Sequence, residues 1–425
     1  MPTYDPRRLA PRIVHVGVGG FHRAHLALYA HELASDGSNW GIVGLGLLPH
    51  DAAMAQALRS QDFLYTLIEK GGGEPSAQVI GTIIGFVHAP EGGGDAAVAA
   101  LVASPATSII SLTITESGYT EPTENGMRTT FDRIAAALAL RRERDAGPVT
   151  ILSCDNLPGN GTAARSAALA AAARVDPALA GWVEDNCLFP NSMVDRITPA
   201  TTDADRAWLR DSAGVDDAWP VVAEPFRQWV MEDAFAGDRP AFEDVGVLFT
   251  DRIGDWEQYK LRMLNATHSS MAYLCALAGI TFVHEAMEQP AVRAFLEDLL
   301  QREAMPTLVE IPGHPPAEYA ASVLDRFANP GVQDQIARIC IDGSAKFPKF
   351  LIPSVERQLE TGGPVERAAT ALAGWARYLA TVDEADQAFD ADGATARRYA
   401  ATALEDAAAF LEFEDVFPPA LRMSS

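Results

Sequence analysis

Hydrophobic and polar positions divide the chain into two parts near residue 250. Before that point, short apolar runs rich in valine, isoleucine and leucine alternate with helical segments such as 95–102 and 131–144. Strands that alternate with helices predict a mostly parallel sheet covered on both faces. The predicted strands are 13–18, 40–47, 63–69, 108–115, 149–154 and 245–250, and residues 61–90 read as extra strands inserted into that plan.

After residue 251 nearly every segment has the periodicity of a helix. The predicted helices are 256–279, 289–304, 317–328, 344–361, 365–382 and 394–411. The pattern therefore predicts an α/β chain. A doubly wound, Rossmann-like domain with inserted strands spans 1–250, and a mainly α-helical substrate domain spans 251–425.

A glycine turn follows the first predicted strand. Residues 13–19 read IVHVGVG, and a predicted helix comes after them. Gly17 and Gly19 match the first two glycines of the dinucleotide fingerprint, which permit a tight turn and a close approach to a pyrophosphate. His22 stands where the fingerprint has its third glycine. The strand before the turn and the helix after it are the context that this motif requires.

The end of the second predicted strand indicates which dinucleotide binds. An acidic side chain there binds the adenosine ribose hydroxyls and repels a 2′-phosphate. Asp51 is the acidic residue, and no arginine or lysine follows until Arg59. NAD is therefore expected rather than NADP, although Asp51 also suits the N-cap of a helix that starts at Ala52. Glu116, after the fourth strand, either lines the nicotinamide pocket or is a loop carboxylate without that role.

The segment 259–273, YKLRMLNATHSSMAY, carries the strongest chemical signal. At about 100° per residue, Asn265 lies roughly 140° and His268 roughly 80° around a helix from Lys260, so the three share one side. That side is otherwise mostly apolar, and a lysine kept from water can lose its proton near neutral pH and act as a base. In the alternative interpretation Lys260 extends to solvent, Asn265 caps a turn and His268 is a core histidine.

A second amide emerges at the carboxyl edge of the predicted sheet. Asn156 follows the fifth strand in SCDNLPGNG. Amide donors aimed at an oxygen stabilise the negative charge that develops there when an alcohol carbon loses hydride. An Asx turn is the structural alternative for this segment.

These motifs together resemble the polyol-specific long-chain dehydrogenases, the mannitol 2-dehydrogenase family, which also includes arabinitol dehydrogenases and fructuronate and tagaturonate reductases. The similar segments follow one another in the family's order along nearly the whole chain. They are GVGGFHRAH (17–25), SCDNLPGNG (153–161), MVDRITP (193–199), FRQWVMEDAF (226–235), KLRMLNATHS (260–269) and DGSAKFPKF (342–350).

The resemblance implies a role for each matching residue. Lys260 is the general base, Asn156 and Asn265 hold the alkoxide, and His268 positions the substrate. Glu257 relays the proton to solvent, unless it is an exposed carboxylate paired with Lys260. The other implied residues are Asp195, Arg338 and Lys346 at the polyol hydroxyls, and Phe21, His22 and Arg23 with the glycines at the cofactor. Without the resemblance, Arg338 and Lys346 read as surface charges.

No metal enters this scheme, because lysine and paired amides replace the Lewis acid of other alcohol dehydrogenases. His22 and His25 are spaced as a helical pair that can chelate zinc, but His22 lies where the phosphate turn is expected. We therefore expect metal-independent chemistry.

Composition narrows the partners. The chain has 57 acidic and 33 basic residues and a net charge of −24, which argues against nucleic acid and anionic membranes and suits a neutral substrate. The first residues have no apolar core like that of a signal peptide, and four cysteines show no zinc or CxxC spacing. A cytoplasmic enzyme with free thiols is expected, and a monomer is compatible with the family.

The sequence thus predicts an NAD-dependent oxidoreductase of carbohydrate metabolism that converts a polyol to a ketose, with D-mannitol and D-fructose as the first choice. D-arabinitol and D-sorbitol are close alternatives. A hexuronate reductase needs an additional cation for the substrate carboxylate. An NAD-binding sensor without catalysis is the non-enzyme alternative, and it has no need to keep a desolvated Lys260.

Overall fold

A computed structural model describes residues 1–425 except 91, 120–128 and 423–425. The chain divides into two compact units, Met1–Gly254 and Asp255–Ser425, which are described separately below.

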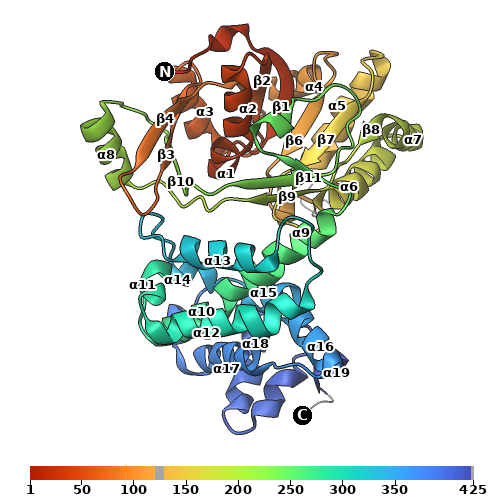
Figure 1. Ribbon diagram of the computed structural model, residues 1–425. Helices are drawn as coiled ribbons and strands as arrows, with labels where there is room; N and C mark the ends of the chain where they lie inside the picture. The colour runs from red at the N-terminus through yellow and green to blue at the C-terminus, as the bar shows by residue number, and fades with distance from the viewer. Residues whose placement is uncertain (91, 120–128, 423–425) are drawn as a thin grey trace. The chain divides into compact units, whose positions relative to one another are not determined.

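The first unit is built on a six-stranded parallel sheet (Figure 1). Its strands, in spatial order, are β5 (Ile83–His88), β2 (Trp40–Gly46), β1 (Ala10–Val16), β6 (Ile109–Leu112), β7 (Val149–Ser153) and β8 (Cys187–Leu188). Numbered along the chain, this is the doubly wound order 3-2-1-4-5-6, which reverses direction beside the first strand. The predicted fold class is confirmed.

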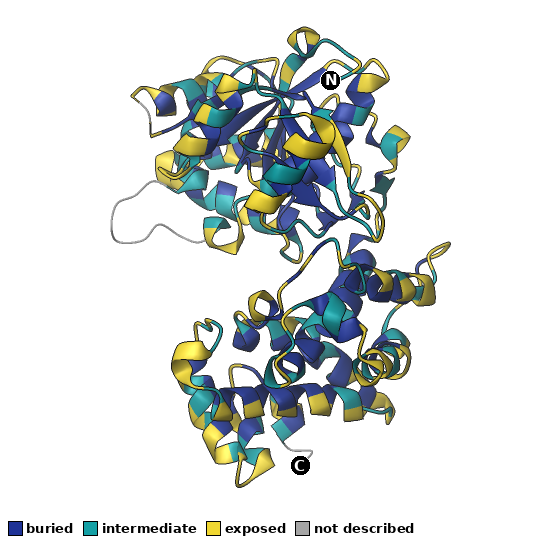
Figure 2. Cartoon of the chain, turned by 90° about the vertical axis from the view of Figure 1, so that its left-hand side faces the viewer, coloured by how far each residue is buried: buried dark blue, intermediate teal, exposed yellow. Residues whose placement is uncertain are grey.

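Helices cover both faces of this sheet because successive strand residues point to opposite sides. Ile13 of β1 packs in one core with α2 (Leu26–Ser35) and α3 (Asp51–Ser60). Its neighbour Val14 packs in the other core, and the helices of that core are α4 (Gly94–Val102), α5 (Thr130–Glu143), α6 (Asn160–Val175) and α7 (Pro177–Asn186). Figure 2 shows the buried strands between helices whose outer faces are exposed.

Two smaller sheets complete the first unit. One has the order β10 (Val221–Ala223), β3 (Tyr65–Glu69), β4 (Ser76–Ile80), and the other the order β12 (Leu248–Phe249), β11 (Gln228–Met231), β9 (Ser192–Asp195). The prediction that all of 61–90 is an insertion is therefore wrong for β5. This strand pairs parallel with β2 and supplies the third strand of the main sheet. The strand predicted at 245–250 shrinks to two residues, since a 3-10 helix (η3, Phe242–Val245) occupies its start.

The second unit is helical in the part of the chain that the structure describes. Its longer helices are α10 (Ala266–Leu277), α12 (Pro290–Asp298), α13 (Pro316–Phe327), α15 (Gly343–Phe350), α16 (Ile352–Thr361), α17 (Glu366–Thr381) and α18 (Gly393–Ala403). Two predicted helices contain a wider turn than expected: the π-helical segments η4 (Lys260–Asn265) and η5 (Leu299–Ala304) interrupt 256–279 and 289–304.

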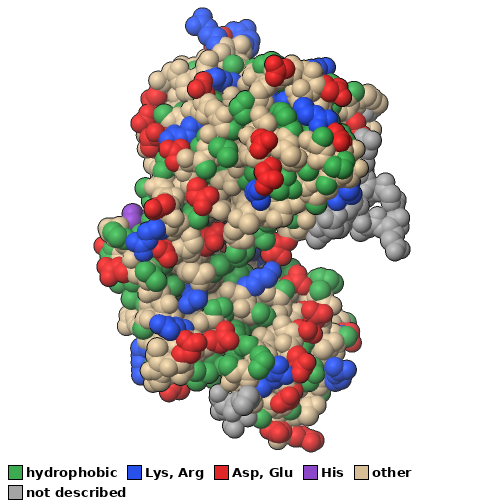
Figure 3. All heavy atoms as spheres, turned by 90° about the vertical axis from the view of Figure 1, so that its right-hand side faces the viewer, with side chains coloured by type: hydrophobic (Ala, Val, Ile, Leu, Met, Phe, Trp, Pro, Cys, Tyr) green, Lys and Arg blue, Asp and Glu red, His purple; other side chains and the backbone are tan. Residues whose placement is uncertain are grey.

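None of the helices described in either unit combines the length and apolar character that crossing a bilayer requires. Acidic and basic side chains are interspersed on the face drawn in Figure 3. All four cysteines are buried and free.

Candidate functional site

The candidate site of the first unit is a cavity of about 600 Å³ at the carboxyl ends of β1, β2 and β6. This is where the strand order reverses and where open α/β sheets bind ligands. Gly17, Gly19 and Arg23 line it from the turn after β1 and from α1 (Gly20–Ala24). Asp51 lines it from the start of α3, and Thr113 from the end of β6. A volume of this size is typical of a cofactor site.

Gly17 is required by the geometry of the turn. Its φ is +87°, and a Cβ on it would lie 2.1 Å from the carbonyl oxygen of Thr113. A side chain at position 17 would therefore push the end of β1 away from the end of β6 or change the conformation of the turn. A Cβ on Gly19 would meet the Gly17 carbonyl oxygen at 3.9 Å, an ordinary contact distance, so the missing side chain leaves room for a ligand to approach the backbone.

The position of the third fingerprint glycine is filled by a buried aromatic stack. The His22 ring lies on the His15 ring of β1, with 3.4 Å between centroids and 15° between planes. Phe21 stacks on His25 in the same way at 4.9 Å. Among the described residues, Phe21 and His22 are not on the cavity wall. The helix thus approaches the strand through ring contact, where the usual motif relies on a glycine.

Arg23 brings a buried cation to the cavity wall. Its side chain is 4% exposed, and its Nη1 donates to the Trp219 carbonyl oxygen at 2.5 Å. Burial lowers the pKa of Arg23 to about 10, so the guanidinium stays charged at neutral pH. Its Nε is buried without a hydrogen-bond partner in the described chain. A buried cation with spare donor capacity suits an anionic ligand.

Asp51 is the first residue of α3, and His50 holds the N-cap position. The Asp51 Oδ2 accepts a hydrogen bond from the Leu48 N–H at 2.9 Å and closes the loop after β2. The helix therefore begins one residue earlier than the alternative interpretation of Asp51 as an N-cap requires.

Glu116 begins the short helix η2 (Glu116–Tyr119) and is exposed, while Thr115, Ser117 and Gly118 beside it line the cavity.

Asp155, which the sequence analysis missed, connects the loops at the ends of β6 and β7. Its carboxylate accepts from the Thr115 N–H at 2.8 Å and from the Tyr119 hydroxyl at 2.6 Å. Thr115 has a φ of +63°, a conformation that a β-branched residue adopts only when its surroundings hold it there. Asn156 follows directly and is exposed. A carboxylate immediately after a buried strand is the signal that identifies Asp155 in the sequence.

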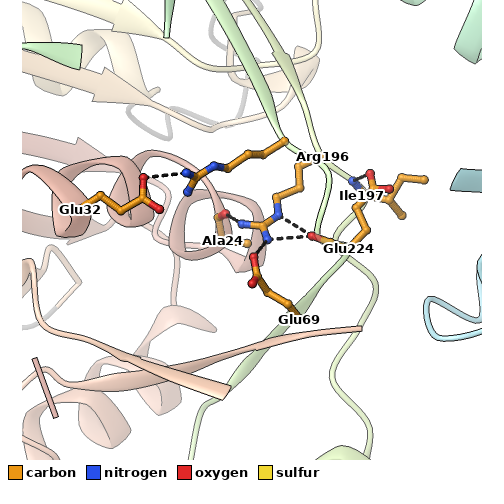
Figure 4. A network of polar contacts seen from close by, with 7 residues as sticks. Ala24, Glu32, Glu69, Arg196, Ile197 and Glu224 are labelled. Atoms are coloured by element: carbon orange, nitrogen blue, oxygen red, sulfur yellow. Dashed lines mark hydrogen bonds and ion pairs between the residues drawn. The ribbon is translucent and has the colours of Figure 1, made fainter. Parts of the chain in front are cut away.

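Asp195 ends β9 and is buried, and its neighbour Arg196 anchors that strand (Figure 4). The Arg196 guanidinium donates to the Glu69 carboxylate, to the Ala24 carbonyl at the end of α1 and twice to the Glu224 carbonyl, at 2.9 and 2.7 Å. One buried side chain therefore holds the ends of β3, β9 and α1 together. Asp195 and Asn156 lie outside the lining of the glycine-turn cavity.

The candidate residues of the second unit lie on η4 and α10. Lys260 is 8% exposed and begins the π segment that Asn265 ends. Since i→i+5 bonding widens the turn, residues five apart come closer around the axis than in an α-helix. Lys260 and Asn265 therefore share a face more closely than the predicted α-helix implied. Glu257 is half-buried on α9 (Ile253–Tyr259), one turn before Lys260.

His268 lies among charged side chains. Its ring stacks on Phe327 at 3.8 Å with 9° between planes, and its Nε2 is buried without a hydrogen-bond partner in the described chain. Burial lowers the pKa of His268 to about 3, and the nearby Arg338 and Lys346 act in the same direction. The structure thus brings together three of the predicted residues of the helical unit.

Arg338 is held by a residue that the sequence analysis did not select. Its Nε and Nη2 donate to the two carboxylate oxygens of Asp334 at 2.8 and 2.6 Å. Lys346 donates to the Ile339 carbonyl at 3.0 Å, and burial together with Arg338 lowers the pKa of Lys346. An acidic residue four positions before the arginine is the sequence signal for this pair.

Fold and motifs agree with comparisons to known proteins. The family model of the mannitol dehydrogenase Rossmann domain matches residues 11–244, and that of the mannitol dehydrogenase C-terminal domain matches 252–424. The chain belongs to the mannitol dehydrogenase family.

Individual relatives cover almost the entire chain. A mannitol 2-dehydrogenase of Phaeosphaeria nodorum is 43% identical over 99% of this chain and 78% of its own length. The ternary complex of Pseudomonas fluorescens mannitol 2-dehydrogenase with NAD and D-mannitol is 39% identical, with a TM-score of 0.87 over 100% of this chain and 90% of that chain. A D-sorbitol dehydrogenase in substrate-free form is 35% identical, with a TM-score of 0.88 over 98% and 90%.

The stacked histidines of the first unit predict loss of stability in mild acid. Burial lowers the pKa of His15 to about 3 and that of His22 well below its usual range. The unfolded chain protonates both near pH 6.5, whereas the folded chain does not, so unfolding takes up protons. Between pH 7.5 and 5.5 the two residues together reduce the free energy of unfolding by about 2–3 kcal/mol. Urea unfolding at both pH values, with the imidazole signals followed by NMR, measures this loss. Imidazole signals of His15 and His22 that titrate in the folded protein near pH 6.5 contradict it.

Proposed function

We propose that this protein is an NAD-dependent polyol dehydrogenase that oxidises a secondary alcohol of a sugar alcohol to a ketone, with D-mannitol and D-fructose as the preferred pair. The principal support is the buried lysine on the π segment, with Asn265 on the same segment, in a chain that is 39% identical to a mannitol 2-dehydrogenase solved with NAD and D-mannitol. The two family models, which together match nearly the whole chain, support the broader assignment to oxidoreductases that act on polyols.

The cavity of the first unit fits NAD. The turn after β1 leaves room for the pyrophosphate beside Gly19, which has no side chain, and Arg23 adds a buried cation for it. Asp51 accepts hydrogen bonds from the adenosine ribose hydroxyls and repels a 2′-phosphate. Phe21 and His22 shape the turn from beneath, and Glu116 lies beside the residues that line the nicotinamide end. NAD supplies the hydride acceptor when it is bound.

The proton is handled by the chain itself. Lys260, little exposed to water, accepts the proton of the hydroxyl that is oxidised, because a desolvated amine favours its neutral form. Glu257, one turn earlier, relays that proton to solvent. The amide N–H groups of Asn156 and Asn265 donate to the alkoxide oxygen and stabilise its charge. No metal ion is required in this scheme.

The remaining residues position the polyol. His268 is neutral, so it hydrogen-bonds a hydroxyl without adding charge. Asp195, Arg338 and Lys346 contact the other hydroxyls. The Asp334 carboxylate already neutralises Arg338, which favours an uncharged polyol over the carboxylate of a hexuronate. D-Sorbitol is the second candidate, since a D-sorbitol dehydrogenase is 35% identical and shares the fold. D-Arabinitol, hexuronate reduction and a catalytically silent NAD sensor are further outcomes for the assay below.

Buried free thiols suit a reducing compartment, so we place the enzyme in the cytoplasm. A single chain carries every residue of the scheme, and a monomer is therefore sufficient for activity.

A substrate panel tests the activity. Mannitol, sorbitol, arabinitol, xylitol, fructuronate and tagaturonate are each assayed with NAD(H) and NADP(H), before and after exhaustive chelation. We expect the highest kcat/KM for mannitol with NAD, and unchanged turnover after chelation. Activity that chelation abolishes and zinc restores contradicts the lysine mechanism, and failure of every substrate favours the sensor.

Replacing Lys260 tests the base. Lys260→Ala is expected to lower kcat by several orders of magnitude, since proton transfer by a positioned group contributes about 10²–10⁴-fold and alkoxide placement is lost as well. NADH binding, followed by fluorescence titration, should remain within a few-fold of wild type. The matched control is Lys349→Ala, an exposed lysine of the same unit, which should keep normal turnover. An active Lys260→Ala enzyme shows that another group takes the proton.

Replacing Asp51 tests cofactor choice. Asp51→Asn keeps an oxygen that accepts from the Leu48 N–H but removes the negative charge. We expect the ratio of kcat/KM for NAD to that for NADP to fall about 10-fold or more, mostly through improved use of NADP. Glu74→Gln, an exposed carboxylate remote from the cavity lining, is the control. An unchanged ratio in Asp51→Asn means that another residue reads the ribose.

A further inference from the structure

We infer that His15 is a positioning residue for cofactor binding, which holds the carbonyl of Gly17 inward so that the turn after β1 keeps an anion-compatible shape. The inference rests on the proposed NAD site. His15 does not line the cavity and lies on β1 with no exposed surface.

The His15 ring forms a defined chain of hydrogen bonds. Its Nδ1 lies 2.8 Å from the Ser111 hydroxyl, and its Nε2 lies 2.9 Å from the Thr113 hydroxyl and 3.2 Å from the Gly17 carbonyl oxygen. The Thr113 hydroxyl in turn donates to the same carbonyl at 2.5 Å. A carbonyl only accepts, so we assign the proton to Nε2 and let Nδ1 accept from Ser111.

Three donors therefore converge on one carbonyl oxygen, because the Gly19 N–H also donates to it at 2.7 Å. This convergence is significant at a glycine, whose backbone reorients at little steric cost. The Gly17 carbonyl and the Val18 N–H belong to one trans peptide plane and point in opposite directions. If this peptide plane rotated, the Gly17 carbonyl would point away from His15, in the direction that the Val18 N–H now takes.

The electrostatic consequence concerns the pyrophosphate. A carbonyl oxygen directed at a phosphate is repulsive, whereas backbone N–H groups attract it. Gly17, Val18 and Gly19 all line the cavity, so the orientation of this plane affects any anion that approaches the turn. His15 and Thr113 stabilise the favourable orientation from beneath.

The ring of His15 is itself held in place and kept neutral. It is stacked against His22 at 3.4 Å, so it has little freedom to turn away from Gly17. Burial lowers the pKa of His15 to about 3, which leaves one ring nitrogen to donate and one to accept at neutral pH. A valine or leucine would fill the same strand position but would give the carbonyl no donor.

The test distinguishes the contribution of the pyrophosphate to binding from that of the rest of the cofactor. Dissociation constants for NADH and ADP-ribose, and the inhibition constant for adenosine, are measured for wild type and for His15→Leu. We expect NADH and ADP-ribose to bind about 10- to 100-fold more weakly, as the loss of a buried hydrogen bond implies, while adenosine is unaffected. KM for NAD should rise while kcat at saturating NAD changes by only a few-fold.

Two further variants keep the test decisive if His15→Leu folds poorly. His15→Gln places an amide N–H near the Nε2 position and should restore most of the affinity for ADP-ribose. Thr113→Val removes a hydroxyl at nearly constant volume and should weaken ADP-ribose without affecting adenosine. The matched control is His31→Leu, another buried histidine of this unit, which contacts Tyr4 and should leave every constant unchanged.

The results distinguish this inference from the proposed function. Wild-type protein that binds neither NADH nor ADP-ribose overturns the proposed function. Wild-type protein that binds both, with His15→Leu and Thr113→Val equal to it, overturns only the role of His15. A parallel loss of adenosine and ADP-ribose affinity in these variants also overturns it, because it indicates general disruption of the cavity.

Discussion

The contact between Gly17 and the carbonyl of Thr113 is the constraint on which the dinucleotide half of this molecule depends. The strand order brings the end of β1 beside the end of β6, and the backbone of one then occupies the space of a side chain on the other. Only a residue without Cβ, at a positive φ, allows the chain to turn there. The cavity forms at this point because the sheet reverses its order on either side of β1.

Several loops of the first unit are fixed by buried polar side chains that each hydrogen-bond more than one partner. Asp155 holds Thr115 in an uncommon conformation, and Arg196 holds the ends of three elements through carbonyls and one carboxylate. Such groups are costly to bury unless they are hydrogen-bonded, and each therefore favours one arrangement of the backbone over its alternatives. The conformation of these loops is therefore set by side chains that do not themselves line the cavity.

Sequence patterns sufficed for the architecture and for the locations of both motifs, because these depend on periodicity and on short, local signals. The place of β5 in the main sheet was not predictable, since an apolar run indicates a strand but not which sheet that strand joins. The π segment at Lys260 was missed for a similar reason: its residues are ordinary helix formers, and the wider turn is decided by packing. Asp155 and Asp334 each have a local sequence signal, but they act on other candidate residues, and the contacts are needed to show which residue each one holds.

Two cations of the helical unit are held by contacts within that unit. Arg338 is neutralised by both oxygens of Asp334, and Lys346 is bound to a carbonyl on the neighbouring helix. In the proposed scheme these cations donate to substrate hydroxyls while they add little net electrostatic field. Lys260 is mostly buried on a π turn, and burial of an amine disfavours its charged form. The oxidation proposed for this protein uses both kinds of group, because fixed charges serve the recognition of an uncharged polyol and a buried amine serves the proton transfer.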